Sequence, residues 1–344
     1  MTPDRPFRPD LPSSDAPTVS DADLGAAARR LAAGELVAFP TETVYGLGAR
    51  ADDDRAVAKI FAAKGRPADH PLIVHVAGAD AALRFAADLP PVARRLIDAF
   101  WPGPLTVVVP RRDGMATAAA AGLPTVGLRC PAHPVARRLL DAAAALGVPG
   151  LAAPSANRFG RISPTEARHV VQEFDGAIPV LDGGRCAAGI ESAIVDVSRG
   201  HPVLLRPGVL TREAIEHAAG EPLRAPDAAA PRAPGTLDAH YAPRAALRLA
   251  SADELRARAA AGEIPPAAAA TDAAVYSRTP LDGSPAGGRI RRMPDDPVRA
   301  AHELFAVLRD LDADGVATIW VEAPPDDPAW EGVGDRLRRA AHRG

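Results

Sequence analysis

Short apolar runs alternate with helix-forming stretches along residues 20–222, and this alternation limits the possible folds more than any other feature of the chain. The runs "LIVHV" (72–76), "LTVVVP" (105–110) and "SAIVDV" (192–197) have strand length, whereas "DRAVAKIFAAK" (54–64) carries apolar residues at helical spacing. Interleaved strands and helices are typical of a sheet covered by helices. We therefore predict an α/β domain over residues 20–222.

Similar patterns extend over the rest of the chain. Further strands are expected at 36–40, 125–131, 150–157, 178–184 and 202–208, and further helices at 21–33, 91–100, 134–146 and 165–174. The first strand, 36–40, is expected to run into a polar turn. Strands at 273–277, 289–293 and 316–323 and helices at 297–311 and 331–342 predict a second, smaller α/β domain over 247–344. Residues 1–19 read as a disordered Pro/Ser/Asp-rich tail, and residues 223–246 as a linker.

Composition narrows the class of protein. A chain of 344 residues with 47% hydrophobic content can bury a core and is long enough for two domains. Two cysteines cannot build a four-cysteine zinc site or a disulfide framework, and no apolar run reaches membrane-spanning length. The first residues lack the pattern of a secretory signal. These features predict a cytoplasmic protein that does not use a membrane, and a net charge of −3 disfavours a general grip on nucleic acid.

Polar residues gather where the expected strands and helices end, which is where α/β proteins place their chemistry. Lys64 and Arg66 lie two apart in "AKGRP"; in an extended backbone they face the same way and can hold one anion. The alternative is a solvated helix end, where cations favour the helix dipole. Ser155 and Asn157 in "APSAN" can bind phosphate or ribose oxygens, or can form an ordinary polar turn.

Three polar residues interrupt apolar strands. Arg129 in "GLRCP" and Arg206 in "LLRPG" need partners if they are buried, and each partner is either a ligand or a structural ion pair. His75 in "LIVHV" is either a ligand-binding residue or a buried core histidine.

Familiar catalytic motifs are missing from the sequence. No G-x-x-x-x-G-K-[ST] loop, no G-x-G-x-x-G fingerprint and no nucleophile elbow occurs, and the nine histidines show no metal-ligand spacing. We therefore predict no metal held by protein side chains. An anion-binding cleft without an enzymic nucleophile fits a reaction in which the substrate supplies the nucleophile.

Seven motifs in register resemble the threonylcarbamoyl-AMP synthase family. They are "FPTETVYGLG" (39–48), "KGRPADHPLIVHV" (64–76), "WPGPLT" (101–106), "LRCPAHP" (128–134), "APSAN" (153–157), "GIESAIVDV" (189–197) and "LLRPG" (204–208). The resemblance implies an α/β fold with a YrdC-like twisted mixed sheet, flanking helices and, in the long form, a smaller Rossmann-like C-terminal domain. It also implies an enzyme that makes threonylcarbamoyl-AMP and pyrophosphate from L-threonine, bicarbonate and ATP with Mg²⁺.

The resemblance implies roles for particular residues. Lys64 and Arg66 would act on the triphosphate as the catalytic cations. The ATP site implied is Lys64, Arg66, His70, Thr125, Ser155, Asn157, Ser163, Arg206 and Tyr241. The L-threonine site implied is Thr43, His75, Arg129, the backbone of Ala153, and Ser192. "PGTLDAHYAP" (234–243) matches a linker motif of the long members, so His240 and Tyr241 would belong to an active-site lid rather than to a docked loop.

Two positions depart from the family pattern. His70 stands where many relatives have Asn, and Ala193 stands where many have Thr; strand alternation predicts that Ala193 points away from threonine.

The resemblance also implies a downstream partner, a tRNA threonylcarbamoyl transferase machinery, with no direct nucleic acid contact required. An RNA-binding module using the same basic cleft is the alternative function, and a related carbamoyl-adenylate enzyme is a second.

Overall fold

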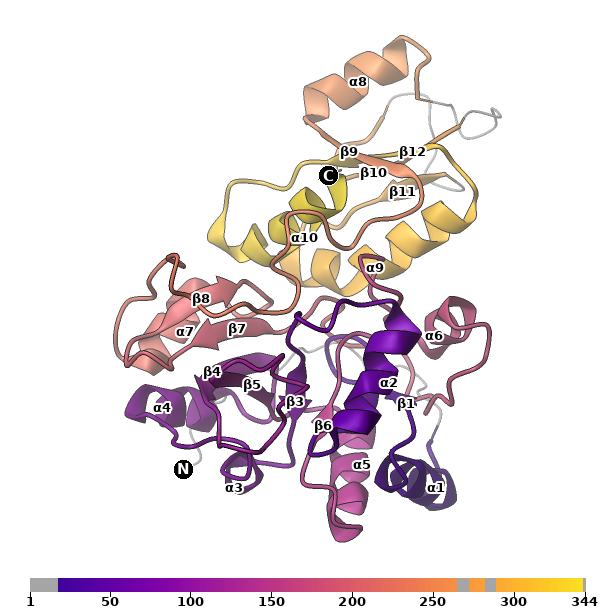
Figure 1. Cartoon of the computed structure of the whole chain (residues 1–344). Helices are drawn as coiled ribbons and strands as arrows, with labels where there is room; N and C mark the ends of the chain where they lie inside the picture. The colour runs from indigo at the N-terminus through magenta and orange to yellow at the C-terminus, as the bar shows by residue number, and fades with distance from the viewer. Residues whose placement is uncertain (1–17, 265–271, 282–288, 343–344) are drawn as a thin grey trace. The chain divides into compact units, whose positions relative to one another are not determined.

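The computed structural model describes residues 18–264, 272–281 and 289–342 and divides the chain into two compact units (Figure 1). The first unit comprises residues 1–159 and 163–236, and the second comprises 160–162 and 237–344. The change of unit at 236–237 falls inside the segment predicted as a linker. Residues 1–17 of the predicted tail lie outside the described residues, whereas Val19 is buried.

The first unit is built on an eight-stranded mixed sheet, which confirms the predicted α/β class. Its strands are β1 (Val37–Phe39), β2 (Gly46–Arg50), β3 (Ile73–His75), β4 (Leu105–Pro110), β5 (Thr125–Arg129), β6 (Leu151–Ala152), β7 (Ala193–Asp196) and β8 (Val203–Arg206). They follow the order β1-β2-β6-β3-β5-β4-β7-β8. The pairs β3–β5 and β4–β7 are parallel and the other pairs are antiparallel.

The described residues of the first unit also form seven helices. They are α1 (Asp21–Ala32), α2 (Asp54–Lys64), α3 (Ala79–Ala82), α4 (Pro91–Phe100), α5 (Pro134–Ala145), α6 (Ala167–Glu173) and α7 (Arg212–Ala219). Local sequence sets their ends: the side chains of Ser20 and Asp53 accept backbone N–H groups at the starts of α1 and α2, and Gly65 ends α2 with a φ of 61°. Helix α1 packs against α5, and α4 against α7.

The two faces of the sheet carry different groups. Val74, Val107 and Leu128 point into the main core, which contains side chains of α2, α4 and α7. On the other face, α1 and α5 cover Phe39, while Ala233 packs on the apolar side chains of β4, β7 and β8. The second face also carries the buried polar side chains of Thr106, Arg129 and Ser192, whose strand neighbours Val107, Leu128 and Ala193 belong to the main core.

Three expected elements differ from the structure. Of the strand expected at 150–157, only Leu151–Ala152 form β6. Residues 178–184 do not form a strand; Val180 makes a single bridge to Ala38 in β1. The polar turn expected after 36–40 ends at residue 46, where strand β2 begins. Glycine is uncommon in strands, so the two glycines of β2 did not indicate one. Gly48 is needed here because a Cβ at this position would lie 2.8 Å from the Phe39 ring. Helix α7 was not predicted from the sequence either.

The second unit is a four-stranded parallel sheet in the order β11-β10-β12-β9, with helices around it. Its elements are β9 (Ala246–Ala250), α8 (Ala252–Ala260), β10 (Ala273–Ser277), β11 (Ile290–Arg292), α9 (Pro297–Ala313), β12 (Thr318–Glu322), a 3₁₀ turn (Pro328–Trp330) and α10 (Glu331–Ala341). Of these, β9 and α8 were not predicted. Among the helices of the described ranges, none is both long and apolar enough to cross a membrane.

Gly103 generates a prediction about the loop between α4 and β4. A Cβ at this position would lie 2.2 Å from the carbonyl oxygen of Phe100, whereas a Cβ at Gly78 would meet nothing within 4 Å. We expect Gly103→Ala to lower the free energy of unfolding by at least about 1–3 kcal/mol, because a backbone atom must move. Denaturant unfolding measures this, and Gly78→Ala is the control. Equal stability of the two variants would contradict the packing described.

Candidate active site

Lys64 closes helix α2 and is buried, with 3% of its surface exposed. Its Nζ donates to the carbonyl oxygens of Ser155, at 2.5 Å, and Asn157. Burial, with the nearby charge of Arg66, holds the pKa of Lys64 well below its usual value. The alternative of a solvated helix end is therefore wrong. The argument from an extended backbone is wrong as well, because Gly65 adopts the left-handed conformation.

Arg66 and His70 lie beside this lysine. The Arg66 guanidinium donates to the carbonyl oxygens of His70, at 3.3 Å, and Pro71, at 2.9 Å, and lies 5.5 Å from the centre of the Phe159 ring. The His70 ring meets the same phenyl ring edge-on at 5.4 Å. Burial and the charge of Arg66 lower the pKa of His70. We call Lys64, Arg66, His70, Ser155 and Asn157 the basic cluster.

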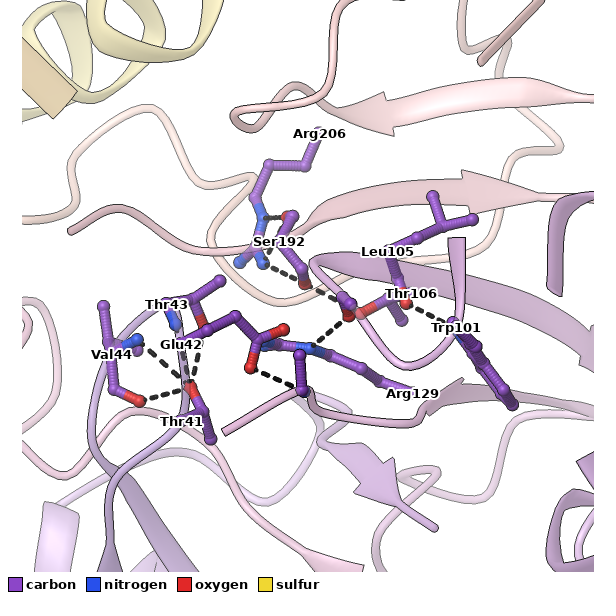
Figure 2. A network of polar contacts seen from close by, with 12 residues as sticks. Thr41, Glu42, Thr43, Val44, Trp101, Leu105, Thr106, Arg129, Ser192 and Arg206 are labelled. Atoms are coloured by element: carbon purple, nitrogen blue, oxygen red, sulfur yellow. Dashed lines mark hydrogen bonds and ion pairs between the residues drawn. The ribbon is translucent and has the colours of Figure 1, made fainter. Parts of the chain in front are cut away.

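A buried ion pair lies at the end of β5 (Figure 2). Arg129 Nη2 is 2.7 Å from Glu42 Oε1, an ion-pair contact without the angles of a hydrogen bond, and both side chains are less than a tenth exposed. Arg129 Nε donates to the carbonyl of Gly103 at 3.3 Å, and Glu42 Oε2 accepts the N–H of Ala132 at 3.0 Å. The expectation that a buried Arg129 needs a charged partner is met by Glu42.

Thr43 and Ser192 flank this pair in Figure 2. The Thr43 hydroxyl lies 2.8 Å from that of Thr41, and the Ser192 hydroxyl lies 2.8 Å from that of Thr106. Both residues are fully buried. Ala193, next to Ser192, belongs to the main core on the opposite face of the sheet, as strand alternation predicted.

Arg206 connects three parts of the first unit. Its guanidinium donates to the Ser192 carbonyl at 2.9 Å and to the Pro234 carbonyl at 2.9 Å. Arg232 pairs with Asp69 at 3.1 Å, and Ala233 packs on the same sheet face. The beginning of the predicted linker is therefore held over the face that carries the polar residues.

His75 lies opposite Arg129 in the register of β3 and β5. Its ring meets Phe39 edge-on at 6.1 Å, and within the described residues its buried Nδ1 has no hydrogen-bond partner. Burial and the charge of Arg129 lower the pKa of His75 to about 3, so its imidazole is neutral near pH 7. The backbone N–H of Ala153 donates to Ile73 at 2.9 Å, which places Ala153 beside the same strand.

Other predicted residues occupy three different places. Thr125 begins strand β5 and shares a face with Arg129 at its end. Ser163 Oγ donates to Glu191 Oε1 at 2.5 Å, next to Ser192 in the chain. His240 and Tyr241 belong to the second unit, where the Tyr241 ring stacks on Phe305 at 5.5 Å and lies 5.2 Å from the Arg336 guanidinium carbon. Their nucleotide and lid roles stay predictions.

Sequence reasoning missed three buried polar residues of this region: Glu42, Thr106 and Glu191. Glu42 lies in the motif "FPTETVYGLG" (39–48). The requirement of a buried arginine for an anionic partner could have indicated it. Thr106 stands in the apolar strand β4, where its hydroxyl needs a partner of its own. Over the described ranges, no three His, Cys, Asp or Glu side chains form a metal-binding group.

Two family models together match nearly the whole chain. The model described as "Telomere recombination" matches residues 29–208, and the model described as "Threonylcarbamoyl-AMP synthase, C-terminal domain" matches residues 210–342.

Relatives of similar length carry the same family name. The threonylcarbamoyl-AMP synthase of Pyrococcus abyssi is 40% identical over 316 residues, which cover 90% of this chain and 91% of the relative. That of Bacillus subtilis is 37% identical over 338 residues, 94% of each chain.

A solved structure, P. abyssi Sua5 complexed with L-threonine, resembles the whole chain. It matches with a TM-score of 0.83 and 36% identity, and the match covers 94% of this chain and 96% of that one.

The fold, the buried polar face and these matches define a two-unit α/β enzyme of the nucleotidyltransferase class. Within that class, the chain belongs to the threonylcarbamoyl-AMP synthase family. The resemblance read from the seven motifs is thereby confirmed, and the alternative of an RNA-binding module is not favoured.

His75 generates a prediction about pH. Its pKa is about 3 in the folded chain and about 6.5 in the unfolded chain, so below pH 6.5 the unfolded chain binds the additional proton and is favoured. Stability should therefore fall as pH drops from 6.5 toward 3, by up to about 1.4 kcal/mol per pH unit from this group. His75→Gln should remove that part of the slope. Denaturant midpoints at pH 7.5, 6 and 5 test this; equal slopes in both proteins would contradict it.

Proposed function

We propose that the chain forms threonylcarbamoyl-AMP and pyrophosphate from L-threonine, bicarbonate and ATP on the polar face of its first unit. The observation that supports this most is the link between the residues expected to hold the two large substrates. Arg206, expected at the nucleotide, donates to Ser192, expected at threonine. Ser163, expected at the nucleotide, donates to Glu191, which precedes Ser192 in the chain.

The ion-paired Arg129 is the proposed anchor for the amino acid. A guanidinium can bind a carboxylate through two parallel N–H groups, and a buried one loses little of that interaction to water. The hydroxyls of Thr43 and Ser192, the neutral imidazole of His75 and the backbone of Ala153 are the proposed polar contacts for the rest of the molecule.

The basic cluster is the proposed site for the triphosphate. Phosphate charge near Lys64 would favour its ammonium form and offset the burial that lowers its pKa. Mg²⁺ would arrive as part of the substrate, bound to phosphate oxygens. We assign Ser155, Asn157, Ser163, Thr125, His70 and Arg206 to the remainder of the nucleotide; the nucleotide role of Tyr241 stays a prediction of the sequence.

The proposed reaction needs no enzymic nucleophile. Threonine and bicarbonate give a carbamate with release of water and a proton; a carbamate oxygen then attacks the α-phosphorus of ATP, and pyrophosphate leaves. Lys64 and Arg66 would neutralise the charge that develops on the leaving group, while Arg129 holds the nucleophile in place. The segment around Ala233, which packs on the same sheet face, would keep water from the carbamate and the mixed anhydride. The lid role of His240 and Tyr241 stays a prediction of the sequence.

Two wider expectations remain predictions of the sequence. The product is expected to pass to a tRNA threonylcarbamoyl transferase machinery, and the enzyme is expected in the cytosol.

Pyrophosphate release tests the reaction directly. We expect release only when threonine, bicarbonate and ATP are all present, and we expect Arg66→Ala to slow it by about 100-fold or more, as for the loss of one donor that stabilises transition-state charge. Arg55→Ala, which removes an exposed arginine from helix α2 just before Arg66 in the chain, is the control. Lys64→Ala is less suitable, because it would also remove the hydrogen bonds that its ammonium donates to the carbonyls of Ser155 and Asn157. Threonine-independent release, or full activity of Arg66→Ala, would contradict the proposal.

A further inference from the structure

The ion pair of Glu42 and Arg129 is surrounded by titratable side chains that are neutral near pH 7. Burial lowers the pKa of His75 and of His133, and burial raises the pKa of the thiols of Cys130 and Cys186. All four groups are thus uncharged near pH 7. Cys130 also contacts Arg137, whose guanidinium donates to the carbonyl of Ala77.

The pair therefore offers one positive and one negative group, 2.7 Å apart. The four neutral side chains add no further charge. A free α-amino acid carries the matching arrangement, because its carboxylate and its ammonium are bonded to the same carbon. A pocket complementary in charge to a zwitterion needs both signs, because each end loses its water on entry.

Glu42 has the capacity for a further contact. A carboxylate can accept about four hydrogen bonds, and the described contacts of Glu42 use Oε2 for the Ala132 N–H and Oε1 for the ion pair with Arg129. Its side chain lies between Thr43 and Arg129 in Figure 2. An ammonium next to Thr43 would lie within reach of this carboxylate.

We propose that Glu42 binds the ammonium of the amino acid substrate while Arg129 binds its carboxylate, so that the pair selects a zwitterion. This inference rests on the function proposed above and adds a specificity-determining residue to it. Glu42 also excludes wrong ligands, because a carboxylate that lacks an ammonium would place two negative charges beside the single positive charge of Arg129, whereas a zwitterion keeps the charges balanced.

The first test uses the unmodified full chain. Calorimetry measures the Kd of L-threonine, of (2S,3R)-2,3-dihydroxybutanoate, in which a hydroxyl replaces the ammonium, and of 1-aminopropan-2-ol, which lacks the carboxylate. We expect each analogue to bind about 10- to 100-fold more weakly than threonine, as for the loss of a charged hydrogen bond. Dihydroxybutanoate binding within about threefold of threonine would overturn the inference.

The second test removes the negative charge of the ion pair. Glu42→Gln leaves the positive charge of Arg129 without its partner, so threonine should bind more weakly, dihydroxybutanoate more tightly, and the ratio of their Kd values should shift by at least about tenfold. Asp196→Asn is the control, since Asp196 is a buried carboxylate paired with Arg199 at 3.5 Å. An unchanged ratio in Glu42→Gln would overturn the inference.

The outcomes separate the two proposals. If Glu42→Gln does not fold, the comparison of ligands on the unmodified chain still decides the matter. If the unmodified chain releases pyrophosphate with threonine but binds both carboxylates equally, the role of Glu42 fails while the proposed function stands. If no threonine-dependent release occurs, the proposed function itself fails.

Discussion

The ion pair between Arg129 and Glu42 is the interaction on which the polar face of the first unit depends. Both side chains are more than nine-tenths buried, and a buried charge is costly unless a partner and hydrogen bonds compensate it. The pair draws together segments that are distant in sequence. Arg129 reaches the loop at Gly103, and Glu42 accepts the N–H of Ala132 through its carboxylate and that of Ala188 through its backbone carbonyl.

The surrounding contacts extend this arrangement across the sheet. Thr106 and Ser192 share a hydroxyl contact between β4 and the start of β7, and Arg206 from β8 binds Ser192 and the carbonyl of Pro234. The segment that follows α7 is thereby held on the same face. At the other polar group, Lys64 from α2 holds the turn at Ser155 and Asn157. Both groups of residues expected to bind substrate are thus held in place by hydrogen bonds within the protein.

The sequence was informative where a local rule decides the structure. Ser20 marks the start of α1, the apolar run at 105–110 forms β4, and the buried arginines implied partners. It was uninformative where a distant contact decides. Nothing near Arg129 indicates that Glu42 is its partner, and the spacing of Lys64 and Arg66 suggested an extended backbone although Gly65 is left-handed.

The linker motif shows the same limit. Its match to the family indicated His240 and Tyr241, but no local pattern indicates that Tyr241 stacks on Phe305 and lies by Arg336 in the second unit.

A double-mutant cycle on unfolding free energy tests the central role of the ion pair most directly. Glu42→Gln, Arg129→Met and the double variant are compared with the unmodified chain in denaturant. The account predicts a coupling energy of about 1–3 kcal/mol. Each single change leaves one buried charge without its partner, whereas the double change removes both charges. A coupling energy near zero would show that Glu42 and Arg129 are held independently and that the pair does not organise the site.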